Sequence, residues 1–166
     1  MMNKTVLNLM NEQIKHELYS AYLYLSMSAY FEANNLAGFA HWMRVQAQEE
    51  LVHAMKFYDF ILERGERVAL LAIEQPPTEF QSPFAIFEQA LEHEKSVTAK
   101  INNIYSAAVK EADYPGQTFL QWFVDEQVEE EKNATSIVET LKLVGSQGNA
   151  LYMLDRELGR REAEED

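Results

Sequence analysis

Apolar residues recur every three or four positions along most of this chain, a spacing that predicts α-helices with one buried face. Helix-favouring Leu, Ala, Glu, Gln, Met and Lys fill these stretches, and the prolines lie between them. The breaks fall at Pro76-Pro77 with Ser82-Pro83, at Asp113–Gly116 and at Gly145–Gly148. The pattern predicts five helices, at about residues 5–34, 37–64, 83–112, 116–144 and 148–159.

The predicted connections differ in length, and this difference indicates the topology. Asn34-Asn35 provides a tight link between the first two helices, whereas about 15 residues separate the second from the third. A helix of about 28 residues is roughly 42 Å long, so this connection can run the length of a bundle. The chain of 166 residues is therefore expected to form a single all-α domain, 1–166, with a four-helix bundle over about 5–144 and one long crossover.

Each of the four long helices carries a stripe that is apolar at both ends and polar in the middle. The central polar positions are Glu17, Glu50, His53, Glu94, Gln127 and Glu130. Carboxylates buried without compensation cost many kcal/mol, so they must be paired, protonated or bound to metal. Because the basic residues fall mostly outside these stripes, a bound cation explains the pattern better than pairing with Lys or Arg.

The spacing of these residues repeats between the two halves of the chain. Glu50 follows Glu17 by 33 residues, and Gln127 follows Glu94 by the same number. A shift of 77 residues places Glu17 on Glu94 and His53 on Glu130. Matching positions on two helix pairs are expected of a pseudo-symmetric site between them, although they do not amount to a sequence repeat.

Glu50-x-x-His53 places a carboxylate and an imidazole one helical turn apart, within reach of one metal ion. Such a short motif often arises by chance, and its significance comes from its position in the middle of the stripe. The acidic run at 126–131 would ordinarily be an exposed surface. Because it flanks the stripe, an adjoining cation site can also be built there from Glu49, Glu126, Glu129 and Glu130.

Tyr24 lies one stripe position beyond Ala21 and seven residues from Glu17, which places it near the proposed metals. It is either a core tyrosine with a satisfied hydroxyl, or a residue that hydrogen-bonds a ligand or takes part in redox chemistry. His16, His41 and His93 lie outside the stripes and are expected to be surface or local packing residues.

Composition narrows the chemistry further. Apolar residues make up 47% of the chain, and the absence of cysteine leaves carboxylate, imidazole, amide and water as ligands. The net charge of −13 disfavours binding to nucleic acids and to anionic membranes, and no Gly-rich phosphate loop is present. Neither a signal-peptide core nor a membrane-length apolar segment is evident, so a cytoplasmic location is expected.

Four stretches combine the residues described above: Glu17–Tyr24, Trp42–His53, Glu92–Lys95 and Phe119–Glu131. With them the chain resembles the prokaryotic non-haem ferritins over essentially its whole length. The resemblance implies a ferritin-like fold and a ferroxidase, an enzyme that oxidises Fe(II) to Fe(III) with dioxygen or peroxide. It also implies a homo-oligomeric cage of 24 subunits that stores ferric oxyhydroxide.

The resemblance also implies roles for individual residues. The first iron would be bound by Glu17, Glu50 and His53. The second would be bound by Glu94 and Glu130, with Glu50 bridging the two ions and Gln127 close by. Glu49, Glu126, Glu129 and Glu130 match a third iron site of the family. Tyr24 matches the conserved tyrosine beside the centre, and it joins the six di-iron residues in the implied catalytic set.

Two related families fit less well. Bacterioferritins carry a second Glu-x-x-His where this chain has Gln127-x-x-Glu130, and a haem-ligating methionine where it has Val52, so no haem is expected. Rubrerythrins carry a Cys-rich iron domain, which a chain without cysteine lacks. In ferritins a short last helix packs around the four-fold axis of the cage. Here Leu151, Leu154 and Leu158 form an apolar stripe on the last helix that suits such packing. The ordinary alternative is that this helix caps the end of its own bundle.

Two alternatives to the ferroxidase remain. Because Gln127 is a neutral ligand, the chain could bind divalent cations without useful oxidase activity. It could also be a structural bundle whose buried carboxyls stay protonated.

Overall fold

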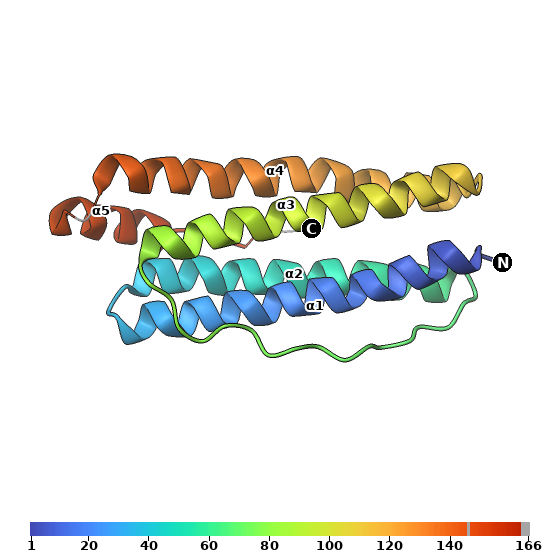
Figure 1. Cartoon of the computed structure of the whole chain (residues 1–166), viewed down its shortest axis with the longest axis horizontal. Helices are drawn as coiled ribbons and strands as arrows, with labels where there is room; N and C mark the ends of the chain where they lie inside the picture. Colours follow the sequence, from blue (N-terminus) through green and yellow to red (C-terminus); the bar gives the residue numbers. More distant parts are fainter. Residues whose placement is uncertain (146, 164–166) are drawn as a thin grey trace.

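The computed structural model describes residues 1–145 and 147–163, and its regular elements are α-helices. In chain order they are α1 (Lys4–Ala33), α2 (Ala37–Glu63), α3 (Pro83–Lys110), α4 (Tyr114–Val144) and α5 (Gly148–Leu158). α1 and α2 form one pair of the bundle and α3 and α4 the other, and the crossover at 64–82 runs along the outside of α1 (Figure 1). The predicted all-α bundle with one long crossover is confirmed.

Local sequence explains where the helices begin and end. Asn3 accepts a hydrogen bond from Thr5 N at the start of α1, and Ser82 accepts one from Ala85 N at the start of α3. α4 begins at Tyr114, two residues before the predicted start, because Pro115 lies in its first turn, where its missing N–H costs nothing. Asn35 adopts a positive φ of 58°, which closes the tight link between α1 and α2.

The apolar core is divided into two clusters with a polar layer between them. The cluster near α5 contains Phe31, Phe39 and Phe87, and the cluster at the opposite end contains Met10 and Phe123. This division matches the stripes of the sequence, which are apolar at both ends. The polar layer therefore lies in the interior, halfway along the bundle.

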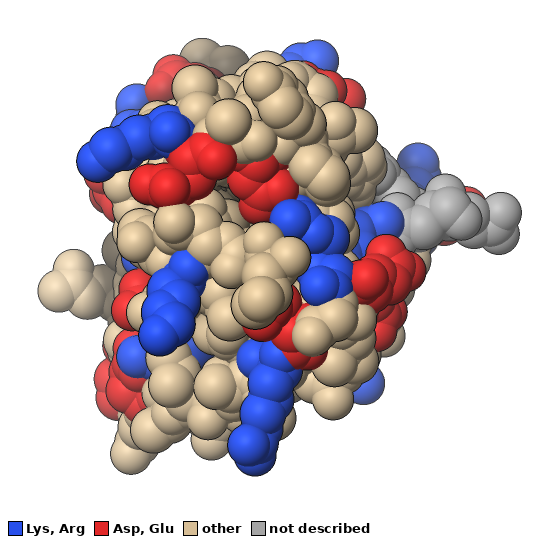
Figure 2. Space-filling view, turned by 90° about the vertical axis from the view of Figure 1, so that its right-hand side faces the viewer, with Lys and Arg blue, Asp and Glu red and all other residues tan. Residues whose placement is uncertain are grey.

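The end of the bundle that faces away from α5 is held by polar contacts. Arg64 Nη1 lies 2.9 Å from Asp113 Oδ1, and Asn3 Nδ2 donates to Glu111 Oε2 at 2.8 Å. Basic and acidic side chains are interspersed on this end of the molecule (Figure 2). In the described part of the chain, no helix combines the length and apolar character that crossing a membrane requires.

α5 packs on its own bundle. Leu154 and Leu158 are buried in the neighbouring apolar cluster, and Leu151 packs against it. The Oδ1 atom of Asp155 accepts a hydrogen bond from Phe39 N at 3.0 Å, which places a carboxylate at the positive end of α2. The apolar stripe of this helix thus has a partner within the single chain.

Candidate metal centre

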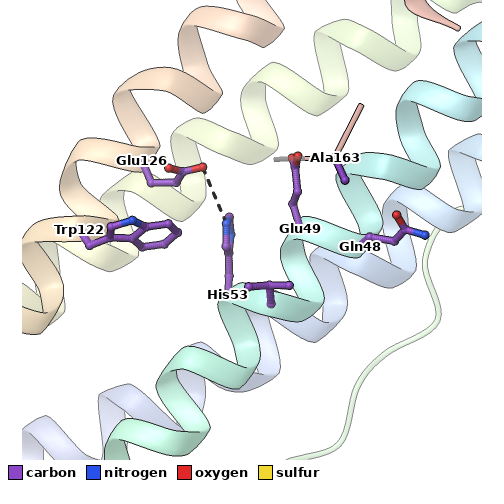
Figure 3. Close-up of a pocket in the computed structure, with 7 residues that line it drawn as sticks. Gln48, Glu49, His53, Trp122, Glu126 and Ala163 are labelled. Carbon is purple, nitrogen blue, oxygen red and sulfur yellow. Dashed lines mark ion pairs between the residues drawn. The ribbon is translucent and has the colours of Figure 1, made fainter. Parts of the chain in front are cut away.

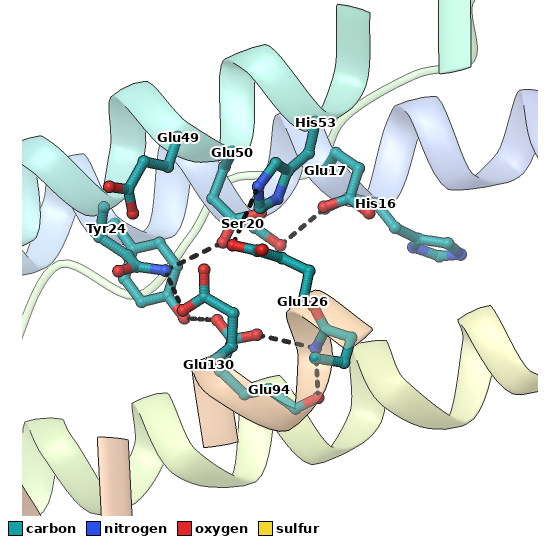
Figure 4. Close-up of polar contacts among 12 residues, drawn as sticks. His16, Glu17, Ser20, Tyr24, Glu49, Glu50, His53, Glu94, Glu126 and Glu130 are labelled. Atoms are coloured by element: carbon teal, nitrogen blue, oxygen red, sulfur yellow. Dashed lines mark hydrogen bonds and ion pairs between the residues drawn. The ribbon is translucent and has the colours of Figure 1, made fainter. Parts of the chain in front are cut away.

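The polar layer brings side chains from all four long helices to one place. Glu17 comes from α1, Glu50 and His53 from α2, Glu94 from α3, and Gln127 and Glu130 from α4. Each of the six is at most 5% exposed. Figure 4 shows the glutamates and His53 pointing toward a common space, whereas His16 points away from it. Helical periodicity places each residue on an inward face, and bundle packing brings the four faces together.

The first group consists of Glu17, Glu50 and His53, whose ligand atoms all lie within 4.8 Å of one another. His53 Nδ1 is 3.3 Å from Glu50 Oε2. Oε2 of Glu17 is buried and accepts no hydrogen bond from the described residues. A buried carboxylate oxygen without a donor is costly, and a cation at this point would satisfy it.

The second group lies between α3 and α4. Gln127 Nε2 donates to Glu94 Oε2 at 3.1 Å, and the Tyr24 hydroxyl donates to the other oxygen of the same carboxylate. Gln46 Nε2 lies 2.7 Å from Glu130 Oε2 and 3.2 Å from Glu50 Oε1, so it contacts both groups. The structure thus brings together all six predicted di-iron residues and Tyr24.

Two glutamines contact the candidate ligands although they were not among the predicted site residues. Gln13 Nε2 donates to Glu17 Oε1 at 2.7 Å, and Gln46 binds Glu50 and Glu130 as described. Each precedes a candidate glutamate by four residues, which is one helical turn. That spacing could have identified both, since a side-chain amide is a suitable donor for a buried carboxylate.

The electrostatics of the layer are those of crowded acids. Burial raises the pKa of Glu17, Glu50, Glu94 and Glu130, and for Glu130 burial and the nearby Glu94 raise it to about 8. Among the described residues, no ion pair joins Lys or Arg to any of these four glutamates. These carboxyls must therefore hold protons or a cation.

Tyr24 and His93, which lie beside the layer, remain neutral. Burial, followed by the Glu94 carboxylate, raises the pKa of Tyr24 well above its usual value, so the phenol keeps its proton. Burial lowers the pKa of His93 to about 4, and its Nε2 lies 2.7 Å from Ser20 Oγ. His93 is thus a packing residue, as expected from its position outside the stripe.

The residues of the predicted third site do not all converge. His53, Glu126 and Glu130 offer ligand atoms within 4.8 Å of one another, and His53 Nε2 lies 3.9 Å from Glu126 Oε1. Glu49 Oε2 instead lies 2.6 Å from Arg161 Nη2, and Glu129 is exposed. A cavity of about 70 Å³ lies here, with Glu49, His53, Trp122 and Glu126 around it (Figure 3).

The donor set fits first-row divalent metals. Its atoms are carboxylate oxygens, an imidazole nitrogen and an amide, which are hard or borderline ligands suited to iron, zinc or manganese. The first group and the cluster of His53, Glu126 and Glu130 have His53 in common, and Gln46 bridges Glu50 and Glu130, so the layer offers two adjoining positions for cations. Such an arrangement can bind and release cations, and two redox-active ions held there can each transfer an electron to a common acceptor.

Comparison with known proteins gives a consistent result. The family model of the ferritin-like domain matches residues 7–144. The chain is 41% identical to the bacterial non-heme ferritin of Staphylococcus saprophyticus, over 99% of both proteins. It is 42% identical to that of Bacteroides fragilis, over 97% of this chain and 100% of the relative. A solved open pore ferritin from the hyperthermophilic archaeon Archaeoglobus fulgidus is 52% identical and has a TM-score of 0.96, covering 97% of this chain and 98% of the other.

Proposed function

This chain belongs to the ferritin family, and we propose from that premise that it oxidises Fe(II) at a dinuclear centre and stores the product. One observation carries the proposal most strongly. Four glutamates and a histidine are buried together midway along the bundle, and in the described structure no lysine or arginine pairs with those glutamates. A pair of divalent cations supplies the missing charge.

We assign the two iron ions to the two groups of the layer. Glu17, Glu50 and His53 would bind the first Fe(II), because their ligand atoms already lie within reach of one ion. Glu94 and Glu130 would bind the second, with Glu50 shared between the ions. Gln127, which donates to Glu94, would orient that carboxylate or offer its amide oxygen once iron displaces the contact.

The reaction transfers one electron from each of two Fe(II) ions to an acceptor. Dioxygen takes up two electrons and two protons to give hydrogen peroxide, and peroxide takes up the same number to give two waters. The carboxylates stabilise the increased charge of the two Fe(III) ions. Because burial raises the pKa of these carboxyls, iron binding releases protons at neutral pH.

We propose that the ferric product is stored as oxyhydroxide inside a homo-oligomeric cage of 24 subunits in the cytoplasm, without haem. The relatives named above are ferritins, and one is described as having an open pore. The surface of α1 and the crossover supports self-association, because Tyr22, Leu25, Leu70, Leu71 and Ile73 are exposed there. Apolar patches of this kind often mark protein contacts.

The proposal is tested by adding Fe(II) aerobically to the metal-free protein and recording the initial rate of Fe(III) formation. Glu50→Ala is expected to abolish fast oxidation, since our assignment has Glu50 bind the first ion with Glu17 and His53 and share the second. Glu88→Ala, which removes an exposed carboxylate from α3, is the matched control and should oxidise at the wild-type rate. Equal initial rates in the Glu50→Ala variant and the wild type would refute the assignment.

A native gel stained in parallel for protein and for iron tests storage separately. Coincident bands at hundreds of kilodaltons are expected for a loaded cage. A small species without iron would contradict storage.

The alternative of a purely structural helical bundle is favoured by one observation, the raised pKa of Glu130. With such a pKa, a carboxyl of the layer can stay protonated at neutral pH and needs no metal. Anaerobic titration with Fe(II) distinguishes the possibilities. A purely structural bundle takes up no ions at this layer, whereas a binding module takes them up but does not oxidise them when air is admitted.

A further inference from the structure

The segment that follows α5 turns back along α2. Gly159 lies against Gly38, where a Cβ on Gly159 would be 3.2 Å from the Gly38 Cα atom. Further along, His41 Nε2 donates to the carbonyl oxygen of Arg161 at 2.7 Å. Ala163 reaches the cavity beside His53. Residues 159–163, here called the C-terminal segment, thus follow α2 from its first turn toward the metal centre.

Arg161 anchors the C-terminal segment through its side chain. Its Nη2 atom lies 2.6 Å from Glu49 Oε2, and its Nη1 atom donates to the carbonyl oxygen of Trp42 at 3.3 Å. The guanidinium carbon is 4.3 Å from the centre of the Trp42 ring. A short ion pair, a second hydrogen bond and a stacked ring together fix the guanidinium, unlike an ordinary surface pair. The side chains of Arg161 and Glu49 are only 18% and 15% exposed.

The position of this contact links it to the metal centre. The cavity of about 70 Å³ has Ala163 and Glu49 on one side and Trp122 and Glu126 on the other, with His53 between them (Figure 3). It has room for an ion with water ligands. Glu49 is the predicted third-site residue that this arginine holds.

We propose that Arg161 competes with a third cation for Glu49, so that the outer site of Glu49 and Glu126 fills only when the C-terminal segment is displaced. The inference rests on the proposed function, because it concerns an ion next to the di-iron centre. The guanidinium occupies Oε2 of Glu49 at 2.6 Å, so a metal can use that oxygen only by displacing Arg161, and the positive charge of the guanidinium repels an ion in the same cavity.

This competition makes the occupancy of the outer site depend on the concentration of iron. When Fe(II) is scarce, the segment stays docked and only the two buried positions fill. When Fe(II) is abundant, the ion displaces Arg161 and the segment lifts from α2. A ligand shifts such an equilibrium only by its difference in affinity for the two states, and here the difference comes from the availability of Glu49.

The test is anaerobic equilibrium dialysis of the metal-free, assembled protein against Fe(II), with the number of ions bound per subunit measured over a range of concentrations. Arg161→Gln should bind the third ion about tenfold more tightly or better, because it removes a charged hydrogen-bond donor from Glu49. Arg160→Gln is the control, since it removes the same charge from an exposed neighbour and should match the wild type. The third-ion affinity of Arg161→Lys should fall between those of the wild type and Arg161→Gln.

A second variant links the effect to Glu49. Arg161→Gln combined with Glu49→Gln should lose the gain in third-ion affinity and still bind two ions. The fluorescence of Trp42 provides an independent readout, since lifting the segment removes the guanidinium from its ring. Both proteins for this measurement carry Trp122→Phe. With Arg at position 161, the fluorescence of Trp42 should change as the third ion binds, and with Arg161→Gln it should not.

The outcomes separate this inference from the proposed function. If the wild type binds two ions and Arg161→Gln binds the third no more tightly than Arg160→Gln does, the competition is refuted and the di-iron assignment stands. If the wild type binds no Fe(II) at all, the proposed function fails as well.

Discussion

Replacing Glu130 with glutamine is expected to make the metal-free protein more stable in alkaline solution. Burial and the nearby Glu94 raise the pKa of Glu130 from the usual 4.5 to about 8. Below pH 4.5 the carboxyl is protonated in both the folded and the unfolded chain. Between these pKa values only the folded chain holds the proton, so the free energy of unfolding falls as pH rises, and the loss is complete above about pH 8.

The size of the effect follows from the difference in pKa. Each pKa unit corresponds to about 1.4 kcal/mol, so the full shift amounts to about 5 kcal/mol, of which about 4 kcal/mol is lost between pH 5 and pH 9. A glutamine at 130 does not titrate, and its amide oxygen can still accept the hydrogen bond from Gln46. The variant should therefore lack this part of the pH dependence.

The assay is denaturant unfolding of chelator-treated protein at pH 5, 7 and 9, with wild type and Glu130→Gln at equal subunit concentration. Glu139→Gln is the control, because Glu139 is an exposed residue of the same helix that pairs with Lys142. It should stay within about 0.5 kcal/mol of wild type at each pH. A divalent cation in excess should restore stability to the wild type at pH 9 more than to Glu130→Gln. Parallel pH profiles for wild type and Glu130→Gln would refute the reasoning.

Three further substitutions probe the packing around the site. Gly38→Ala should release α5, because the new Cβ would lie 1.6 Å from the Asp155 carbonyl oxygen. Proteolysis after residue 148 should then be faster than in the wild type, and an unchanged rate of cleavage would contradict this. Tyr24→Phe removes a buried hydrogen bond from Glu94, and anaerobic titration should show second-ion affinity about tenfold weaker, with the first unchanged. Asp113→Ala removes the N-cap of α4 and the ion-pair partner of the half-buried Arg64. Denaturant unfolding should show a free energy of unfolding about 2–4 kcal/mol lower than that of the wild type. A loss below about 0.5 kcal/mol would exclude a stabilising role for Asp113.

The sequence alone determined the helices and the residues of the polar layer. Helical periodicity is a local property, so the inward face of each helix follows from residues three and four positions apart. For that reason Glu17 and Glu94 could be placed near the middle of the bundle before any packing was known. Proline and glycine placed the breaks, and the length of the crossover indicated the pairing of the helices.

Contacts between elements depended on the tertiary structure. No spacing rule connects Arg161 with Glu49, which are 112 residues apart, because their meeting requires α5 to dock on α2 through Gly38 and Asp155. The same applies to Gln46, which the periodicity placed on the inward face but which only packing brings to Glu130. Periodicity assigns a residue to a face, whereas the partner of that face depends on the direction in which each helix crosses its neighbours.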